Sequence, residues 1–238
     1  MSLFDVFIFL IVFILLIVPV GKHISKLILH EETIFESFFS KIEKFIFKIT
    51  KNQNMNIKTY IGAFLGINLT MLILTYIILA LDGSSPSLAF NTAVSFMTNT
   101  NLQHYSGEWL NGTMSRLALI NLMFTSAASG LAVSMAIIRG ILKIRLGNFF
   151  EDLVKSITRL LLPLSIIAAI ILVILGIPQT FNTQAVVKTL EGQYQVLTLG
   201  PSAAWEAIKH LGTNGGGIFS ANSSHPLKIF LYIQTILK

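Results

Sequence analysis

The sequence has no cysteine, and charged residues make up only 12% of its 238 positions. The missing thiols exclude disulfides, thiolate metal sites and cysteine nucleophiles. Soluble domains carry about 25% charged residues, so a soluble fold of this size would lack the usual polar coat. Because 53% of the residues are hydrophobic, we expect a lipid bilayer rather than water to be the solvent of this chain.

Two kinds of functional motif are also missing. Neither a Gly-x-x-x-x-Gly-Lys-Ser/Thr loop nor an Asp-Lys-Thr-Gly motif occurs, so we expect any ATP chemistry to belong to a partner. The five histidines form no His-Glu-x-x-His pair that would predict a zinc site. We interpret them as interfacial or loop residues, with His104 and His210 near the outer end of the protein.

Long uncharged runs are what the sequence has instead. Residues 60–81, 117–138 and 160–177 contain no charged side chain, and a spanning helix needs about 20 apolar residues. Residues 6–20 form another apolar run. A cleaved signal peptide is the alternative for this run, but its basic residues follow it rather than precede it, and no small-residue cleavage site comes next. Residues 229–237 are apolar but too short to cross.

The distribution of lysine and arginine predicts the orientation. Of the 17 basic residues, seven lie in 22–58 and five in 139–159, and none lies in 82–113. The positive-inside rule then places the N-terminus outside and the first helix running inward. Phenylalanines recur at helical spacing among charged residues in 35–47, which favours an amphipathic helix at the membrane interface over a nucleic-acid patch.

The external stretches contain two short helix signals. Ser85-Pro86-Ser87 opens the apolar run 88–97, which ends at Thr98-Asn99-Thr100-Asn101. Serine caps helices, and proline suits a first helical turn. Ten residues span about half a bilayer at about 1.5 Å per residue. Gly200-Pro201-Ser202 likewise opens 203–211, which ends at Gly212 and Thr213. A shift of 115 positions superposes Thr98 on Thr213 and Asn99 on Asn214, which suggests a duplicated pore element.

Electrostatics indicates what such re-entrant loops bind. A half-helix entering from outside directs its partially negative C-terminal end at the membrane centre, and this favours a cation. Gly215, Gly216 and Gly217 can adopt positive φ, so we expect their carbonyl oxygens to point the same way and replace an ion's hydration shell. Neither loop contains a carboxylate in its Thr-Asn turn, which suits a monovalent cation better than a divalent one. The alternatives are an ordinary turn, a flexible linker and a phosphate nest.

Two segments resemble the filter loops of one known family. Residues 90–101, with Gln103 and Tyr105-Ser106-Gly107-Glu108, resemble the first filter loop of the potassium-binding subunit of bacterial Kdp potassium-transporting ATPases. Residues 212–217 and 221–226 resemble the second, and residues 122–130 with Arg139 resemble the third helix of that family. The similarity runs from residue 1 to about Pro226.

The resemblance implies an all-α membrane protein of the potassium channel and transporter type. Its span–re-entrant pore loop–span repeats surround one pore, and two of four repeats are present. The expected parts are an extra N-terminal helix (1–28), a cytoplasmic amphipathic loop (29–58), a first repeat (59–142) and a second repeat (143–238) that is truncated in its last helix. The implied potassium-binding residues are Thr98, Asn99, Thr100, Asn101 and Gln103 from the first loop, and Thr213, Asn214, Gly215, Gly216 and Gly217 from the second.

The resemblance also implies partners and a location. The chain is expected to bind extracellular potassium, to bind no ATP, and to be a non-catalytic subunit of a high-affinity uptake complex. Its expected partners are a catalytic P-type ATPase subunit, small accessory subunits and membrane lipid, with no nucleic acid. We expect it in the bacterial plasma membrane as a multi-pass protein.

Two features depart from the family pattern. Leu102 stands where the family commonly has an aromatic residue, which affects packing behind the filter. After His225-Pro226 the family typically continues Phe-Glu-Asn-Pro-Thr, whereas this sequence continues Leu227-Lys228-Ile229. Loss of one thymine from TTT-GAA-AAT produces such a change, so we hypothesise a frameshift there. Two alternative functions stay open: a Trk-type secondary potassium or sodium transporter, whose loop would carry a single glycine, and a non-functional truncated remnant.

Overall fold

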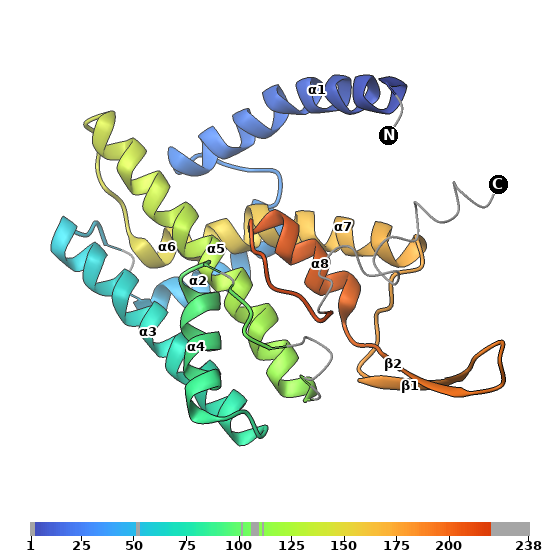
Figure 1. Ribbon diagram of the computed structural model, residues 1–238. Coiled ribbons are helices and arrows are strands. Elements are labelled where there is room, and N and C mark those ends of the chain that lie inside the picture. The colour runs from blue at the N-terminus through green and yellow to red at the C-terminus, as the bar shows by residue number, and fades with distance from the viewer. Residues whose placement is uncertain (1–2, 51–52, 101, 106–109, 111, 220–238) are drawn as a thin grey trace. The chain divides into compact units, whose positions relative to one another are not determined.

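Helices make up most of the computed structural model, which describes residues 3–50, 53–100, 102–105, 110 and 112–219. The elements (Figure 1) are, in order, α1 Leu3–Ile28, α2 Glu36–Thr50, α3 Ile57–Leu81, α4 Pro86–Met97, α5 Thr113–Ile141, α6 Phe149–Ser156, the π-helix η2 Ile157–Leu161, α7 Leu162–Ile174, β1 Gln184–Lys188, β2 Tyr194–Thr198 and α8 Ser202–Leu211.

Four helical stretches are long and apolar enough to cross a membrane: Val6–Ile28, Ile57–Leu81, Thr113–Ile141 and Phe149–Ile174. They confirm the four spans expected from the apolar runs. The fourth begins well before residue 160 and therefore carries Glu151, Asp152, Lys155 and Arg159. The apolar run 160–177 therefore marks only part of the fourth span, because the ion pairs described below neutralise charges that a count of apolar residues treats as a helix boundary.

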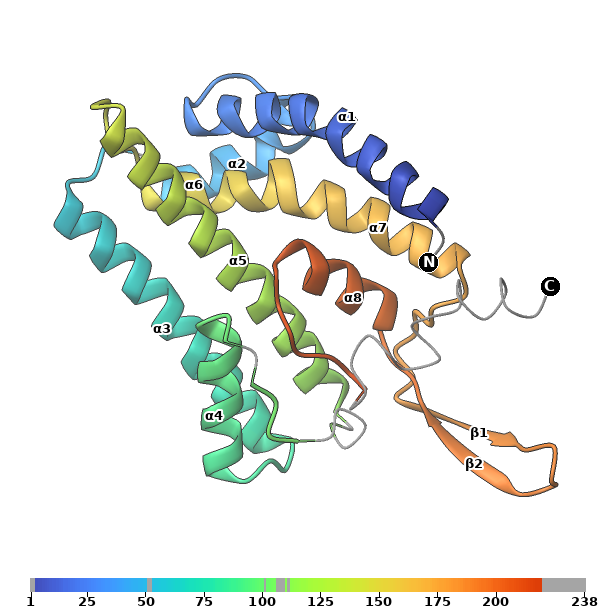
Figure 2. The same ribbon diagram turned by 45° about the horizontal axis from the view of Figure 1, so that its top comes forward.

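The expectation of an all-α fold is also wrong between α7 and α8. Strands β1 and β2 pair antiparallel, with Gln184 opposite Thr198 and Lys188 opposite Tyr194. Valine and tyrosine favour strands, and Gly192 supplies the positive φ of +83° that the hairpin turn requires. Figures 1 and 2 show this hairpin extending away from the helices of its own unit.

Most helices end in the same local motif. The residue after the helix adopts a left-handed conformation, and the next N–H donates back to a carbonyl in the last turn, as Thr100 does to Ser95. This arrangement satisfies carbonyls that have no partner within the helix. The left-handed residues are His30, Gly83, Asn99, Lys143, Gly176 and Thr213.

The chain divides into two compact units. The first comprises Met1–Tyr60 and Leu131–Leu160, and the second comprises Ile61–Gly130 and Leu161–Lys238. The predicted loops both belong to the second unit.

A buried arginine organises one side of the first unit. Arg159 donates to both carboxylate oxygens of Glu43, from Nε at 2.9 Å and from Nη2 at 2.6 Å, and to Glu36 at 3.0 Å. Pro163 has no N–H to offer the Arg159 carbonyl one turn back, and that carbonyl instead accepts a hydrogen bond from His23 Nε2 at 2.8 Å. The π-helix thus connects α1, α2 and the fourth span.

A second charged cluster surrounds Arg139 in the same unit. Its guanidinium contacts the carboxylate of Asp152 and the imidazole of His30. Tyr60 donates to Asp152 at 2.8 Å, and the His30 Nδ1 lies 3.3 Å from Glu151. His30 lies in the left-handed turn after α1, in keeping with its interpretation as an interfacial or loop residue, and this turn also brings it against the charged cluster.

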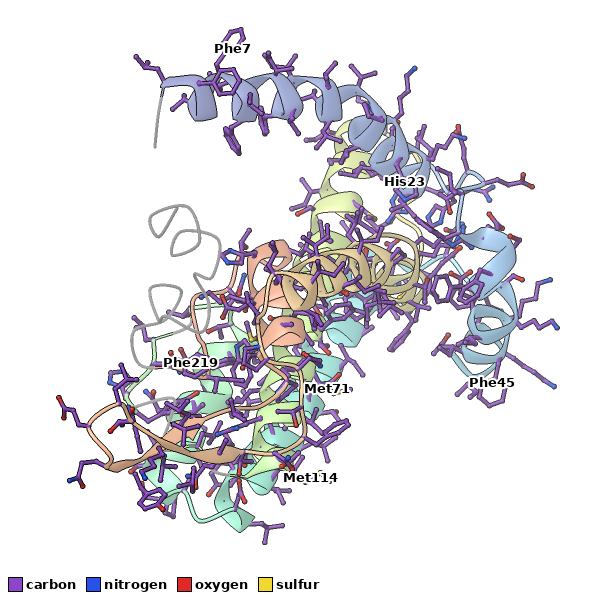
Figure 3. All side chains as sticks on the ribbon, turned by 90° about the vertical axis from the view of Figure 1, so that its right-hand side faces the viewer. Phe7, His23, Phe45, Met71, Met114 and Phe219 are labelled. Atoms are coloured by element: carbon purple, nitrogen blue, oxygen red, sulfur yellow. The ribbon has the colours of Figure 1, made fainter. Side chains whose placement is uncertain are left out.

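Helix α2 confirms the expected helix, but one of its acidic residues is on the buried side. Its buried residues are Phe39 and Glu43, whereas Phe38 and Phe45 are 77% and 67% exposed. Figure 3 shows Phe45 on α2 and Phe7 on α1 projecting from their helices. The pair with Arg159 turns Glu43 inward, so the exposed face of α2 combines phenylalanine and isoleucine side chains with Lys41, Lys44 and Lys48.

The second unit has the main apolar core. Leu79 of α3, Phe96 of α4, Leu119 and Met123 of α5, and Trp205 of α8 are all fully buried in it. Figures 1 and 2 show α4 beside the C-terminal part of α3, where the rings of Tyr76 and Phe90 meet edge to face at 6.4 Å. Helix α8 packs against α7. The core therefore holds both short helices, α4 and α8, in fixed positions.

Candidate functional site

The first loop starts where α4 ends. Pro86 stands at the beginning of α4, as the sequence indicates, but the Ser85 side chain makes no capping hydrogen bond. At the other end Asn99 adopts a left-handed φ of +57°. The hydroxyls of Thr98 and Thr100 lie 2.7 Å apart, and the Leu102 N–H donates to Ser95 Oγ at 2.7 Å. The loop therefore folds back over the end of its own helix.

The second loop starts in the same way after α8. Thr213 adopts a left-handed φ of +54°, and the Asn214 N–H donates to the Lys209 carbonyl at 2.9 Å. The Asn214 side chain is buried and donates to Gly212 at 3.1 Å and to Met123 of α5 at 3.4 Å. Asn214 thus ties the loop to the core and presents no exposed amide.

The backbone corrects the predicted register between the two loops. Asn99 and Thr213 occupy the same left-handed position, and Thr98 corresponds to Gly212. The two helix ends are therefore related by 114 positions, and the shift of 115 that pairs Thr98 with Thr213 is wrong by one residue at the helix ends. The shift of 115 pairs identical residue types, Thr with Thr and Asn with Asn. The left-handed position of the turn, however, is occupied by an asparagine in the first loop and by a threonine in the second.

The two loops lie side by side. Asn99 Nδ2 donates to the Gly212 carbonyl at 3.2 Å and to Thr213 Oγ1 at 3.4 Å. Gln103 Nε2 donates to the Gly217 carbonyl at 2.8 Å, and the Gly217 N–H donates back to Gln103 Oε1 at 3.1 Å. The two loops that the resemblance implies around one pore are thus in direct contact, and the reciprocal amide pair fixes their separation.

The glycines serve a different purpose from the one expected. Gly215, Gly216 and Gly217 do not have positive φ. A Cβ on Gly216 would lie 2.3 Å from the Phe96 ring, so this glycine permits close packing between the loops. Its carbonyl accepts from Trp205 Nε1 at 3.0 Å, while that of Gly217 accepts from Gln103. Among the described residues, the carbonyls of Thr213, Asn214 and Gly215 accept no hydrogen bond.

The exposed members of the predicted set, which form the exposed edge of the two loops, are neutral. Within the described residues they are Thr98, Thr100, Thr213 and Gly215, and none of them is ionisable, although His104 beside Gln103 is exposed as well. Burial raises the pKa of nearby Tyr105 to about 12, so its phenol stays neutral at ordinary pH. What this edge offers an ion is therefore uncharged oxygen.

Two half-helices direct the same electrostatic end at these loops. The C-terminal ends of α4 and α8 meet at Asn99 and Gly212, and each end carries partial negative charge. Sequence reasoning missed a buried ion pair on α8, where Lys209 Nζ lies 3.3 Å from Glu206 and both side chains are buried. The spacing of three residues on a helix is a signal that could have revealed it.

Several sequence-based predictions fall outside the described residues. They concern Asn101 of the first loop, Ser106, Gly107 and Glu108, residues 221–226, the frameshift hypothesis at residues 227–229, and the apolar stretch 229–237.

Comparisons with known proteins bear on the whole chain. The sequence pattern of the family described as Potassium-transporting ATPase A subunit matches residues 7–233. Proteins named "Potassium-transporting ATPase potassium-binding subunit" are 45% identical over 244 residues in Clostridium acetobutylicum and 45% identical over 241 residues in Caldanaerobacter subterraneus.

These alignments cover 96% and 94% of this chain, but only 44% and 43% of the two relatives. A relative with the same name in Flavobacterium johnsoniae is 44% identical over 232 residues, which are 90% of this chain and 40% of that protein. The chain thus spans less than half the length of these relatives. The match favours the pump subunit over a Trk-type transporter. Because the family pattern covers almost the whole sequence, the chain belongs to the Potassium-transporting ATPase A subunit family.

Proposed function

We propose that this chain binds extracellular potassium between its two loops, as part of an ATP-driven potassium uptake complex. The observation that carries this proposal is the reciprocal hydrogen bonding of Gln103 and Gly217 between two helix ends of the same geometry. Such a fixed pair of loops can keep neutral oxygens at a constant distance from an ion that has lost its water.

The potassium-binding site we propose consists of Thr98, Asn99, Thr100, Asn101, Gln103, Thr213, Asn214, Gly215, Gly216 and Gly217. Within this set the exposed edge contributes hydroxyl and carbonyl oxygens as ligands, and the buried members hold that edge in place. Backbone oxygens replace the hydration shell of a monovalent cation. The absence of a carboxylate from the described loop residues disfavours strongly hydrated divalent ions.

The topology we propose follows from the basic residues. Exposed Lys143 and Arg145, together with the lysines of α2, support a cytoplasmic position for the α5–α6 connection and for α2 under the positive-inside rule. The N-terminus and the β-hairpin are then outside, and α4 and α8 enter from that side. Residues 59–142 and 143–238 form two span–re-entrant loop–span repeats of the four in the family, after an extra helix (1–28) and a cytoplasmic segment (29–58).

Partners follow from the family. The relatives are named as subunits of a potassium-transporting ATPase, and we extend this role to the present chain. A separate P-type ATPase subunit would hydrolyse ATP, small accessory subunits would complete the complex, and the site would be in the plasma membrane of a bacterium. The chain itself contributes ion selection rather than catalysis.

A matched pair of glycine substitutions tests the proposal. Gly216→Ala places a methyl group against the Phe96 ring, whereas Gly130→Ala adds one where nothing lies within 4 Å. We expect potassium and rubidium to raise the unfolding temperature of the purified chain more than sodium does. Gly216→Ala should lose this difference, and Gly130→Ala should keep it.

Two outcomes would contradict the proposal. One is a wild-type chain that potassium and sodium stabilise equally. The other is a Gly216→Ala chain that discriminates between them as well as the Gly130→Ala chain does. Co-purification of the chain with a P-type ATPase subunit tests the proposed partnership separately.

A further inference from the structure

Arg116 is a fully buried arginine in the first turns of α5. Its guanidinium donates from Nε to the Leu110 carbonyl at 2.7 Å, and from Nη1 to the carbonyls of Leu199 and Thr183, the latter at 3.5 Å. Its Nη2 has no hydrogen-bond partner among the described residues. All of these contacts lie within the second unit.

No carboxylate lies within 4 Å of this guanidinium in the described part of the chain. Arg139 and Arg159, by contrast, both pair with acidic residues. A buried charge without a directly paired carboxylate is costly, and here carbonyl dipoles and the more distant charge of Asp82 offset that cost. All the described hydrogen bonds of this arginine thus go to backbone carbonyls, an arrangement that suits a positioning role.

The three carbonyls come from two regions next to the loops. Leu110 follows the first loop and precedes α5. Thr183 and Leu199 are the two ends of the β-hairpin, where the Leu199 N–H donates to Thr183 at 2.9 Å. One guanidinium thus joins the exit of the first loop to the segment that leads into α8.

The entry to α8 is built closely around this arginine. Gly200 has a φ of +146°, and a Cβ there would lie 2.8 Å from Arg116 Nη1. Two residues later α8 begins, and it runs for 10 residues to the second loop. A short rigid helix transmits a shift at its start to its end, so the position of Gly200 affects that of Gly212.

We propose that Arg116 is a positioning residue that sets the spacing between the two loops and thereby the ion selectivity of the site. This role rests on the proposed potassium-binding function. The arginine contacts neither the ion nor the loop edge. It acts through α8, as a second anchor in addition to the Gln103–Gly217 pair at the opposite end of that helix.

The fork of the guanidinium is essential to this role. Arginine offers five N–H donors in a planar arrangement, whereas lysine has the same charge at a single point. Arg116→Lys therefore preserves the charge and removes the simultaneous contacts. The exposed Arg145 provides the matched control, Arg145→Lys. Gly200→Ala disturbs the contact between Arg116 and the Leu199–Gly200 backbone by adding a methyl group to the backbone. It replaces Arg116→Lys as the test variant if Arg116→Lys fails to fold.

The first measurement is hydrogen exchange of the full chain in lipid nanodiscs. We expect Arg116→Lys and Gly200→Ala to increase exchange in peptides covering 102–112 and 180–204, with no change in α1 or α2. Arg145→Lys should behave as wild type. Unchanged exchange in both segments would overturn the proposed contact, whether or not the chain binds potassium.

The second measurement is discrimination between potassium and sodium, from the salt dependence of the unfolding temperature. Loss of a charge-assisted hydrogen bond corresponds to about a tenfold change in a binding constant. We therefore expect Arg116→Lys to reduce the ratio of potassium affinity to sodium affinity about tenfold. Increased exchange with unchanged discrimination would show a merely structural residue and overturn the positioning role. A wild-type chain without discrimination would instead refute the proposed function, while the exchange data would still report on the contact.

Discussion

At the scale of single residues, the two loops depend on side chains in an unfavourable backbone conformation. Asn99 and Thr213 both have φ near +55°, at +57° and +54°. Asparagine tolerates this region, but a β-branched threonine is a genuine outlier there. Strained residues often occur at functional sites, where the surrounding structure holds them in place. The contact between Thr213 Oγ1 and Asn99 is one interaction that holds this threonine.

Two substitutions at Thr213 separate backbone strain from hydroxyl chemistry. Both Thr213→Gly and Thr213→Ala remove the hydroxyl, but only glycine relieves the left-handed strain, which costs about 1–2 kcal/mol. We expect Thr213→Gly to be more stable than Thr213→Ala by about 1 kcal/mol in denaturant unfolding, while both lose potassium preference equally. Equal stability of the two variants would show that the turn is unstrained.

At the scale of elements, α2 is attached to the fourth span by the Glu43–Arg159 pair. Burial alone would raise the pKa of Glu43, but hydrogen bonds from Arg159 and Thr158 outweigh burial and lower that pKa below its ordinary value of 4.5. A carboxylate with a lowered pKa stabilises the fold above pH 4.5, and this contribution is lost as the pH falls through the lowered pKa.

Glu43→Gln tests this attachment. Breaking a buried ion pair typically costs about 3–5 kcal/mol, so we expect the variant to unfold well below the wild-type temperature at pH 7. The gap between the two should close as the pH is lowered below 4.5, because Glu43 of the unfolded wild-type chain is protonated there and Glu43 of the folded chain is protonated once the pH falls through its lowered pKa. Thermal unfolding across this pH range measures the effect.

Exposed Glu32 supplies the control for this prediction. Glu32→Gln removes the same charge without breaking a buried pair, and it should match wild type at every pH. A Glu43→Gln chain as stable as the Glu32→Gln chain at pH 7 would show that the buried pair does not hold α2 in place.

At the scale of the whole molecule, the sequence predicts the elements better than the contacts between them. Apolar runs are a local property, so the four long helices and the starts of α4 and α8 could be found from the chain alone. The charged clusters around Arg139 and Arg159 could not, since each joins segments that lie more than 100 residues apart, as Arg159 and Glu43 do. The β-hairpin could not be predicted in this way, because its two strands have only five residues each and are mostly exposed, so they carry no long apolar run.

In the candidate site, too, the elements could be predicted from the sequence but most contacts between them could not. The positions of the two loops and their juxtaposition could be predicted from repeated helix-and-turn signals. The role of Gly216 could not, because its cause is the Phe96 ring on another helix. Arg116 was missed for a related reason: its partners are backbone carbonyls, which leave no trace in a sequence.

The absence of cysteine makes the proposed topology directly testable. Any introduced cysteine is the only thiol in the chain, so a membrane-impermeant maleimide reports the location of that position. Leu190, at the tip of the hairpin between β1 and β2, and Lys143, between α5 and α6, are both exposed. The two positions are separated by one span, Phe149–Ile174, and must face opposite sides if that helix crosses the bilayer.

We therefore expect Leu190→Cys to react with the reagent in intact cells and Lys143→Cys to react only after the cells are permeabilised. The positive-inside rule gives this direction, since Lys143 and Arg145 lie together at one end of the span and the hairpin lies at the other. Labelling of both positions from outside would mean that Phe149–Ile174 does not span. Reversed labelling would place α4 and α8 on the cytoplasmic side and would turn the potassium-binding loops away from the external ions they are proposed to select.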